Sequence, residues 1–133
     1  MRFRVWDDEN KVMWNIERWH IEDEYFDLIE PNKSVVDLNA SRVQRKQSDV
    51  ILMQSTGLFD INEKELFEGD IVETIYNGKL FTGVIVYDQE ETDFKATNGH
   101  NEYGNNFRYL GGNDSIIVIG NIYENKELVE VEE

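Results

Sequence analysis

Residues 70–87 read DIVETIYNGKLFTGVIVY, and this stretch decides the expected fold. Asn77 and Gly78 both accept the positive φ angles that a two-residue type I′ turn requires. The β-branched and aromatic residues on either side favour extended backbone. The pattern therefore predicts a β-hairpin with one strand over 70–76 and a second strand over 79–87.

Both faces of this hairpin are expected to be apolar. A two-residue turn sets Ile75 opposite Leu80 and Ile71 opposite Val84 on one face. The other face is expected to carry four large side chains: Val72, Tyr76, Phe81 and Val86. A hairpin that is apolar on both sides belongs inside a barrel or beneath a partner chain, and Gly83 is expected to mark a bend or bulge that allows closure.

Glu68, Gly69 and Asp70 precede the hairpin and allow two interpretations. Gly69 reaches positive φ easily, and the Asp70 carboxylate can accept backbone N–H groups in a turn that starts a strand. Two neighbouring carboxylates can also share acid and base roles when their environments separate their pKa values. We expect the structural turn, and we likewise expect Thr56 and Asp60 to make turn hydrogen bonds.

The chain beyond the hairpin predicts further short elements. Residues 88–93 form an acidic turn, which fails as a calcium loop because Asp93 and Gly99 stand where that loop needs Gly and a bidentate Glu. Residues 98–114 are rich in Asn and Gly, and this composition predicts a mobile segment. Three regular elements are expected around it: a return strand over 94–97, a last buried strand over 116–120 and one helical turn over 127–131.

The first half of the chain alternates short apolar runs with acidic turns. Strands are expected at four of these runs: 2–6, 13–16, 18–21 and 25–29. A continuous apolar run over 50–54 predicts a strand buried on both faces, and a helix is expected within 38–46. Four aromatic side chains are expected to pack in the core: Trp14, Trp19, Tyr25 and Phe26.

Together these elements predict a mostly β fold. The expected architecture is a compact SH3-like or related small barrel with short peripheral helices. The 133 residues fit one domain over 1–133, with N-terminal strands over 1–54 and a barrel-like part over 67–123.

Three blocks of the sequence, in order along the chain, carry a family resemblance: RFRVWD at 2–7, MQSTGLFD at 53–60 continued by FEGDIV at 67–72, and IGNIYEN at 119–125. With these blocks the chain resembles the YopX family of small proteins carried by phages and prophages. The resemblance implies a compact β-rich domain with peripheral helical pieces, and it implies no biochemical activity. The chain departs from the family pattern at Glu63, where Gly is usual, and at Lys126, where Pro is usual.

The charge is strongly acidic and unevenly distributed. The chain has 13 Lys and Arg against 28 Asp and Glu, a formal net charge of −15. Residues 1–50 hold 8 cations against 11 anions, or −3, and residues 51–133 hold 5 against 17, or −12. Binding to phosphates needs clustered cations, and only Arg42, Arg45 and Lys46 form a local group. We therefore expect this group to be solvated and expect no direct binding to nucleic acid.

Few residues are available for catalysis or metal binding. The chain has no Cys and only two His. His20 is expected to be partly buried and hydrogen-bonded, and His100 to lie exposed in a loop. We identify no catalytic, cofactor-binding or metal-binding residue. No apolar run approaches the roughly 20 residues of a membrane span, and the N-terminus has no signal-peptide core, so the expected location is the cytoplasm of a bacterial host.

Several kinds of function stay open. The leading one is a non-enzymatic accessory protein that acts through self-association and protein contacts, including contact with a host protein. The family resemblance favours a hexamer, and surplus apolar surface is expected on five residues: Trp14, Trp19, Val72, Phe81 and Val86. The alternatives are an acidic DNA mimic that inhibits a host nucleic-acid-binding protein, a carboxylate- or metal-dependent enzyme acting on nucleotides or nucleic acid, and an SH3-like module that binds nucleic acid or a peptide.

Overall fold

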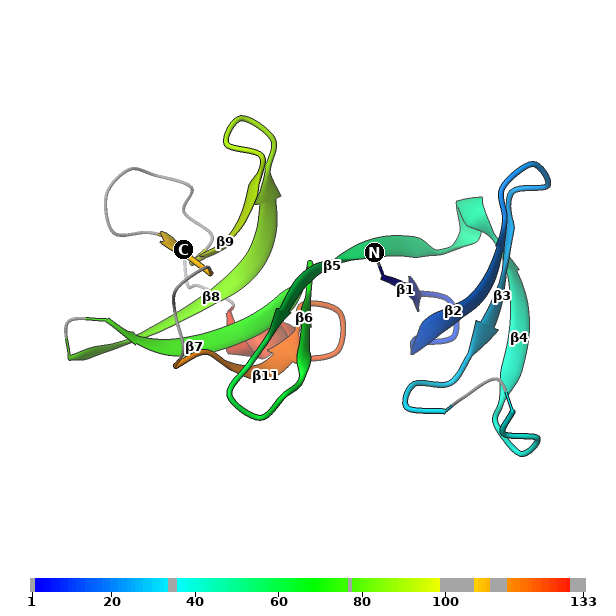
Figure 1. The fold of residues 1–133 in the computed structure, drawn as a ribbon, viewed down its shortest axis with the longest axis horizontal. Coiled ribbons are helices and arrows are strands. Elements are labelled where there is room, and N and C mark those ends of the chain that lie inside the picture. The colour runs from blue at the N-terminus through cyan, green and yellow to red at the C-terminus, as the bar shows by residue number, and fades with distance from the viewer. Residues whose placement is uncertain (1, 34–35, 77, 99–106, 111–114, 130–133) are drawn as a thin grey trace. The chain divides into compact units, whose positions relative to one another are not determined.

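The computed structural model of this chain describes residues 2–33, 36–76, 78–98, 107–110 and 115–129 (Figure 1). The chain divides into two compact units, Met1–Gln54 and Ser55–Glu133. Antiparallel strands make up nearly all of the regular structure, and the described residues contain no α-helix. No helix in this part of the chain is long and apolar enough to span a membrane.

The first unit contains the first strands of a six-stranded antiparallel sheet with the order β4-β3-β2-β1-β5-β6, and β5 continues past the end of this unit at Gln54. Its elements are β1 Phe3–Asp7, β2 Val12–His20, β3 Tyr25–Ile29, β4 Arg42–Lys46, the 3-10 helix η1 Gln47–Asp49 and β5 Ile51–Phe59. The runs 13–16 and 18–21 largely fall within one strand, β2, whose register against β3 shifts between Ile16 and Arg18. The strands predicted from the apolar runs of the first half are therefore present.

Large side chains form the core of this unit. Four of them are buried: Val5, Trp14, Phe26 and Leu28. Trp19 packs edge-on against Phe3, with ring centroids 5.6 Å apart, and against Phe26 at 5.2 Å. The predicted core positions of Trp14, Trp19 and Phe26 are confirmed, so neither Trp supplies the surplus surface expected from the sequence. Tyr25 lies on the opposite face of β3, because successive strand residues alternate between faces.

The helix expected within 38–46 is wrong, because residues 42–46 form the strand β4 and pair with β3. Alternation along the strand explains this conformation. Val43 packs against the core, and Arg45, two residues later, reaches the buried Asp7 carboxylate at 2.9 Å. Contacts with other strands thus decide the conformation of a segment that has no strong local preference.

The strand expected over 50–54 extends further and is not buried on both faces. Met53 is buried, but Leu52 on the opposite face is 37% exposed. The first half of β5 pairs with β1, and its second half pairs with β6, Glu65–Phe67. Each half of β5 therefore has a neighbouring strand on one side only, and the continuous apolar run does not mark a central strand.

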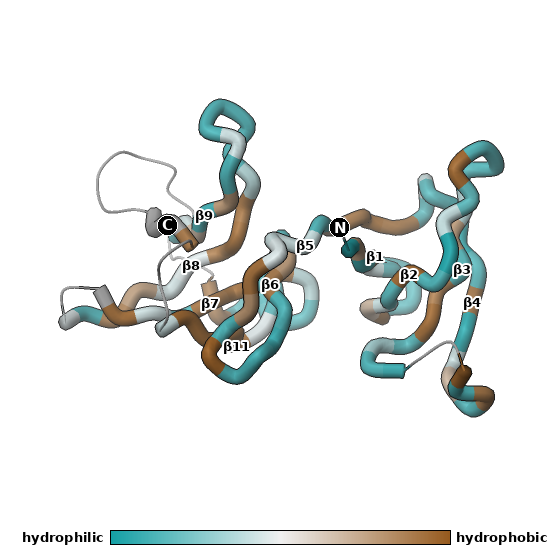
Figure 2. The backbone as a smooth tube through the Cα atoms, in the orientation of Figure 1, coloured by the Kyte–Doolittle hydropathy of each residue, from teal (hydrophilic) through white to brown (hydrophobic). Residues whose placement is uncertain are grey.

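The second unit contains a five-stranded antiparallel sheet in the order β10-β9-β8-β7-β11. Its elements are β7 Asp70–Tyr76, β8 Lys79–Asp88, β9 Asp93–Thr97, β10 Phe107–Tyr109, β11 Ile117–Asn121 and the 3-10 helix η2 Lys126–Leu128. Figure 2 shows hydrophobic segments along β7 and β11. Seven buried side chains form the core: Leu66, Val72, Phe81, Ile85, Ala96, Leu110 and Ile116.

The β7–β8 hairpin has the register predicted from its two-residue turn. Ile75 lies opposite Leu80, and Ile71 lies opposite Val84. Of the two turn residues, Gly78 has a φ of 77°, and the other lies outside the described residues. The turn therefore sets the pairing of the whole hairpin, as expected for a loop of this length.

The two faces of the hairpin differ in burial. Val72 and Phe81 pack into the core, so the surplus apolar surface expected on them is absent. Val86 was expected on their face, but alternation along β8 places it on the opposite one. On that opposite face Ile75 is 56% exposed and Leu80 is 61% exposed. The hairpin is thus apolar on both sides, as predicted, and its second side is buried at Ile71 but exposed toward the turn, at Ile75 and Leu80.

Gly83 lies at a close approach between strands, not at the expected bulge. A Cβ atom at this position would lie 2.9 Å from the carbonyl oxygen of Thr97 on β9. The register of β7 and β8 is regular where Val72 faces Gly83. The missing side chain therefore makes room for the neighbouring strand.

No closed barrel is detected among the described residues, and the five-stranded sheet of the second unit is open. The turn between β5 and β6 covers the outer edge of β11. The Ile61 N–H donates to the Ile116 carbonyl at 3.1 Å, and the Val118 N–H donates to Asp60 Oδ2 at 3.0 Å. The β5–β6 turn therefore forms hydrogen bonds with the β11 edge at the place where a closing strand of the predicted barrel would have paired.

The remaining predictions concern the second half of the chain. The return strand and the last strand are present as β9 and β11, and the C-terminal helical turn is the 3-10 helix η2. Three predictions fall wholly or mainly outside the described residues: the Tyr76 side chain, the mobile segment 98–114 and His100. Within that segment the structure does describe β10 and the buried Leu110.

Candidate functional site

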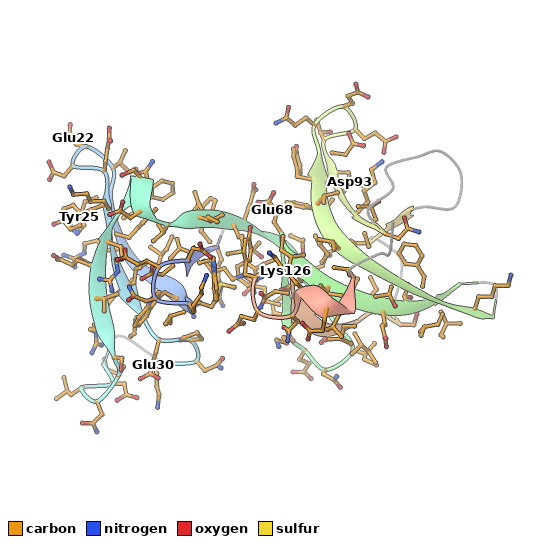
Figure 3. The ribbon with its side chains drawn as sticks, turned by 180° about the vertical axis from the view of Figure 1, so that it is seen from behind. Glu22, Tyr25, Glu30, Glu68, Asp93 and Lys126 are labelled. Carbon is orange, nitrogen blue, oxygen red and sulfur yellow. The ribbon has the colours of Figure 1, made fainter. Side chains whose placement is uncertain are left out.

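The turn before β7 connects three segments of the second unit through Gly69 and Asp70. Gly69 has a φ of 87°; its N–H donates to the Ile85 carbonyl, and its carbonyl accepts from the Ile122 N–H, both at 2.9 Å. The buried Asp70 carboxylate accepts the Phe67 N–H at 2.8 Å. The predicted turn geometry is confirmed for both residues. Their neighbour Glu68 is labelled in Figure 3.

Asp60 is a buried acid whose two oxygens accept backbone N–H groups. Oδ1 accepts from Asn62 at 2.8 Å and from Lys64 at 2.9 Å, and Oδ2 accepts from Val118 at 3.0 Å. Burial alone would raise the pKa of Asp60, but the three N–H donors and the Lys64 charge hold the pKa below its ordinary value. Glu63 in the same turn has a φ of 64°, so the backbone keeps the left-handed conformation that favours Gly.

Two hydroxyl oxygens in the β5 strand of the β5–β6 hairpin also accept backbone N–H groups. Ser55 Oγ accepts the Gly57 N–H, and Thr56 Oγ1 accepts the Leu58 N–H, both at 3.0 Å. Ser55 Oγ also donates to Glu65 Oε2 at 2.5 Å, which links β5 to β6. The turn hydrogen bonds predicted for Thr56 and Asp60 are therefore present.

The block at 119–125 is a turn held by two Asn side chains. Asn121 Oδ1 accepts the N–H groups of Tyr123 at 3.0 Å and Glu124 at 2.9 Å. Asn125 Oδ1 accepts the Asn121 N–H at 3.1 Å. A Cβ atom at Gly120 would lie 2.5 Å from that same oxygen, so the glycine leaves space for the Asn125 side chain. The residue types of this block are explained by backbone hydrogen bonds.

A polar cluster in the first unit brings His20 and Asp27 together on the face of the sheet that carries Tyr25. His20 Nε2 lies 2.9 Å from Asp27 Oδ2, and the imidazole stacks on the Tyr25 ring with centroids 4.1 Å apart. Gln44 Nε2 donates to Asp27 Oδ1 at 2.8 Å. The hydrogen bond from His20 lowers the pKa of Asp27. Partial burial opposes this shift, and the Gln44 hydrogen bond and the charges of His20 and Arg18 add to it.

This cluster is the arrangement in the first unit with the most chemical capacity. A histidine hydrogen-bonded to a carboxylate can hold or transfer a proton, and one quarter of each side chain is exposed. The prediction that His20 is partly buried and hydrogen-bonded is confirmed. Sequence analysis missed its partner, which lies diagonally across the hairpin that turns at residues 21–24. In the described chain, no group of three or more His, Asp or Glu side chains could hold a metal ion.

The expected basic group on β4 is largely paired with acids. Arg42 Nε lies 3.2 Å from Glu17 Oε1, and Arg45 Nε lies 2.9 Å from Asp7 Oδ2. Burial would raise the pKa of Asp7, but hydrogen bonds from Asn10 and Arg45 and the Arg45 charge lower it below its ordinary value. The expectation of a solvated group is therefore wrong for Arg45, because its guanidinium is paired with the buried Asp7 carboxylate.

The acidic segment at 88–93 is the turn expected between two strands. Asp88 Oδ1 accepts the N–H groups of Glu90 at 2.9 Å and Glu91 at 3.2 Å. Lys95 Nζ lies 2.7 Å from Asp88 Oδ2, and its hydrogen bond is the largest cause of the lowered pKa of Asp88. The Asp88 carboxylate is therefore engaged within the turn.

The second unit exposes two groups of apolar side chains. The first, the outer hairpin face, consists of Ile75, Leu80 and Val86 on β7 and β8. The second, the β5–β6 apolar group, consists of three exposed residues at the hairpin that precedes β7: Leu58, Phe59 and Ile61. Neighbouring exposed apolar side chains are typical of protein interaction surfaces, and Ile75 and Leu80 are such neighbours across β7 and β8.

Comparisons with known proteins agree with this fold. A family model described as YopX protein matches residues 2–130. A solved structure described as the crystal structure of protein EF1440 from Enterococcus faecalis has a TM-score of 0.55 and 23% sequence identity to this chain, and the match covers 97% of both chains. This likeness shows a shared fold. No curated protein matches the chain.

Proposed function

Because this chain belongs to the YopX family, we propose that it is a phage or prophage accessory protein that acts through self-association and protein contacts and catalyses no reaction. The observation that carries this proposal is the outer hairpin face. Ile75 and Leu80 are paired across β7 and β8, yet both are more than half exposed. Covering such side chains is favourable by roughly 25 cal/mol for each Å² of apolar surface removed from water.

Self-association of this chain has to overcome charge repulsion. Residues 51–54 are uncharged, so the second unit, 55–133, carries 5 cations and 17 anions, or −12. Copies with the same net charge repel one another, and stable interfaces bury about 1,200–2,000 Å² in total. An apolar contact must therefore supply most of the free energy, and the β5–β6 apolar group enlarges the apolar surface of the same unit.

Light scattering of the full chain tests this proposal. We expect a mass well above the 15.7 kDa monomer at micromolar concentration and moderate salt. The double variant Ile75→Lys, Leu80→Lys should lower that mass. It changes the formal net charge by +2, from −15 to −13, which weakens repulsion between copies, so charge cannot account for a loss of association.

A matched control comes from the first unit. Ile21→Lys also adds a cation at an exposed apolar residue, which is 71% exposed in the β2–β3 turn. This variant should leave the mass unchanged. A monomeric wild-type chain, or an equal effect of the control variant, would contradict the proposal.

The proposed assembly is a closed ring of six copies, the number favoured by the family resemblance. Heterologous contacts form rings when the rotation between neighbouring copies closes. Native mass spectrometry should then show six times 15.7 kDa, or about 94 kDa. Another stable mass would correct the number of copies and leave self-association in place.

A second candidate function is inhibition of a host nucleic-acid-binding protein by mimicry of DNA. The observation that favours it is the concentration of charge, −12 within residues 55–133. A mimic should bind a basic protein in competition with DNA, and this binding should weaken as salt rises. Duplex DNA added to a captured host complex should release the host protein, and a complex that DNA does not disturb would contradict this candidate.

A further inference from the structure

Two side chains in the loop between β3 and β4 are the most exposed large hydrophobic residues in the described part of the chain. Val36 is 80% exposed and Leu38 is 90% exposed, and both lie in a part of this loop that Figure 2 shows to be hydrophobic. Residues 36–38 are called the loop tip below. Each of the two side chains leaves most of its apolar surface in water, so packing within the first unit does not account for them.

Asp37, at the centre of the loop tip, holds this part of the loop in shape. Its Oδ1 accepts the Asn39 N–H at 3.0 Å. Its carbonyl oxygen accepts the Ala40 N–H at 3.3 Å and a hydrogen bond from Arg42 Nη1 at 3.0 Å. Lys33 Nζ lies 3.7 Å from Asp37 Oδ2. A segment that is already ordered loses less conformational entropy when it binds, so the loop tip is suited to serve as a contact surface.

The charges around the loop tip differ from those around the next most exposed apolar residue of the first unit. Residues 31–42 contain two cations and one anion, a net charge of +1. Residues 21–24, which include the 71% exposed Ile21, contain three anions and no cation, a net charge of −3. An acidic partner surface repels residues 21–24 but does not repel the loop tip.

The outer hairpin face is an apolar surface on the acidic second unit. Ile75 and Leu80 lie opposite each other and are 56% and 61% exposed. Glu73 shares their face, because it lies two residues before Ile75 on β7. A surface that covers Ile75 and Leu80 should therefore be apolar and should bring no excess of negative charge.

Net charge favours a contact between unlike units over a contact between two second units. Residues 1–54 carry −3, as do residues 1–50, because 51–54 are uncharged, and residues 55–133 carry −12. Coulomb repulsion scales with the product of the two charges. At equal distance, the repulsion of −12 by −12 is therefore about four times that of −12 by −3.

We propose that the loop tip of one copy docks on the outer hairpin face of a second copy. This inference rests on the proposed self-association and names one contact within it. Val36 and Leu38 cover Ile75 and Leu80, so that apolar surface of both copies leaves water together. The contact joins two different surfaces. Each copy can therefore give its loop tip to one neighbour and receive the tip of another, as a closed ring requires.

Truncation of the loop tip tests this contact in the full chain. The double variant Val36→Ser, Leu38→Ser keeps the formal net charge at −15 and shortens only exposed side chains. It should weaken association between copies about tenfold by analytical ultracentrifugation, with the urea midpoint unchanged. Ile21→Ser is the matched control and should leave association unchanged. A loop-tip variant that assembles as the wild type does would overturn the proposal.

Disulfide trapping locates the contact without removing it. The chain has no Cys, so each introduced thiol is unique in its copy. A Leu38→Cys copy mixed with an Ile75→Cys or a Leu80→Cys copy should form a linked dimer under mild oxidation, since a disulfide needs Cα atoms about 4.4–6.8 Å apart. An Ile21→Cys copy in place of the Leu38→Cys copy gives the background from random collision. Linking no faster than this background in both mixtures would overturn the contact, and so would faster linking between two Leu80→Cys copies.

The outer hairpin face provides the reference for these outcomes. If Ile75→Lys, Leu80→Lys dissociates the protein while the loop-tip variant has no effect, self-association stands and the loop-tip contact fails, because another surface then covers the hairpin. If the wild-type chain is monomeric, both proposals fail together. The two failures are thus distinguishable in one set of masses.

Discussion

The two units satisfy their buried acids in different ways. In the first unit, Asp7 accepts from Asn10 in its own turn and is also paired with the guanidinium of Arg45 from another strand. In the second, Asp60 and Asp70 accept backbone N–H groups of turns. Backbone N–H groups donate the three hydrogen bonds to the Asp60 carboxylate, and the Lys64 charge adds only the smallest contribution to its lowered pKa. This is one reason why the second unit can carry a formal net charge of −12 while the first carries −3.

This difference also separates the kinds of contact that each unit offers. The most exposed apolar residues of the first unit, Ile21, Val36 and Leu38, lie in turns, whereas the second unit exposes the paired strand residues Ile75 and Leu80 on a strongly acidic body. A contact through the outer hairpin face should strengthen with salt, because salt screens the repulsion between copies.

The largest expected effect comes from the two cores. Phe26→Ala in the first unit and Phe81→Ala in the second should each cost about 3–5 kcal/mol, because a buried aromatic ring leaves a cavity. If the units unfold separately, Phe26→Ala should speed amide hydrogen exchange within 2–54 and leave 55–129 protected. Equal acceleration in both ranges would show that the two cores unfold as one cooperative body.

The next effect concerns the backbone-held acid of the second unit. Asp60→Asn should cost about 2 kcal/mol at pH 7, because an amide cannot accept from all three N–H donors. Folding lowers the pKa of Asp60, so its stabilisation is present above the unfolded value of 3.8 and is lost as the pH falls through the lower folded value. The difference in urea midpoint between wild type and variant should therefore shrink below about pH 4. A difference that stays constant down to pH 2 would contradict this account.

A smaller effect is expected at Asp70, which bears on the catalytic interpretation of the turn. Asp70→Ala should cost about 1 kcal/mol through loss of the bond from the Phe67 N–H, and Asp70→Asn should be milder because it keeps an acceptor. Melting temperature and oligomeric mass should be measured on both variants. An Asn variant that keeps its stability but loses all activity in the cell would favour a catalytic carboxylate over a structural one.

The smallest effect should come from the exposed pair of Arg42 and Glu17 in the first unit. Arg42→Gln should cost less than about 1 kcal/mol, because water screens a pair at this exposure. Lys33→Gln is the matched control, since Lys33 makes a longer contact of 3.7 Å with Asp37. A loss above 2 kcal/mol in urea unfolding would show that the Arg42 pair supports the β3–β4 ladder as strongly as a buried pair does.

The features that sequence analysis predicted correctly depend on short-range geometry. The two-residue turn at Asn77 and Gly78 was enough to set Ile75 opposite Leu80, because loop length determines hairpin register. The turn role of Asp60 was predictable for the same reason, since two of its N–H partners lie two and four residues away. Such bonds form between neighbours in the chain and need no knowledge of the whole fold.

The features that sequence analysis missed depend on residues far apart in the chain. β4 is a strand because it pairs with β3 and Arg45 reaches Asp7, which lies 38 residues earlier. His20 and Asp27 are only seven residues apart, but their pairing depends on the register of β2 against β3, which the sequence pattern did not determine. Which side of the β7–β8 hairpin is exposed was likewise undecided, because both sides are apolar in sequence.

Alternation and turn residues specify that this chain forms antiparallel strands, where its hairpins turn and which side chains share a face. They do so because each depends on the φ and ψ angles of a few adjacent residues. Three-dimensional packing decides which of two apolar faces is covered, whether the last strand closes a barrel or meets a turn, and which acids find cations. These outcomes depend on the free energies of burial and strand pairing between segments that are far apart in the chain. A local sequence pattern does not determine those free energies.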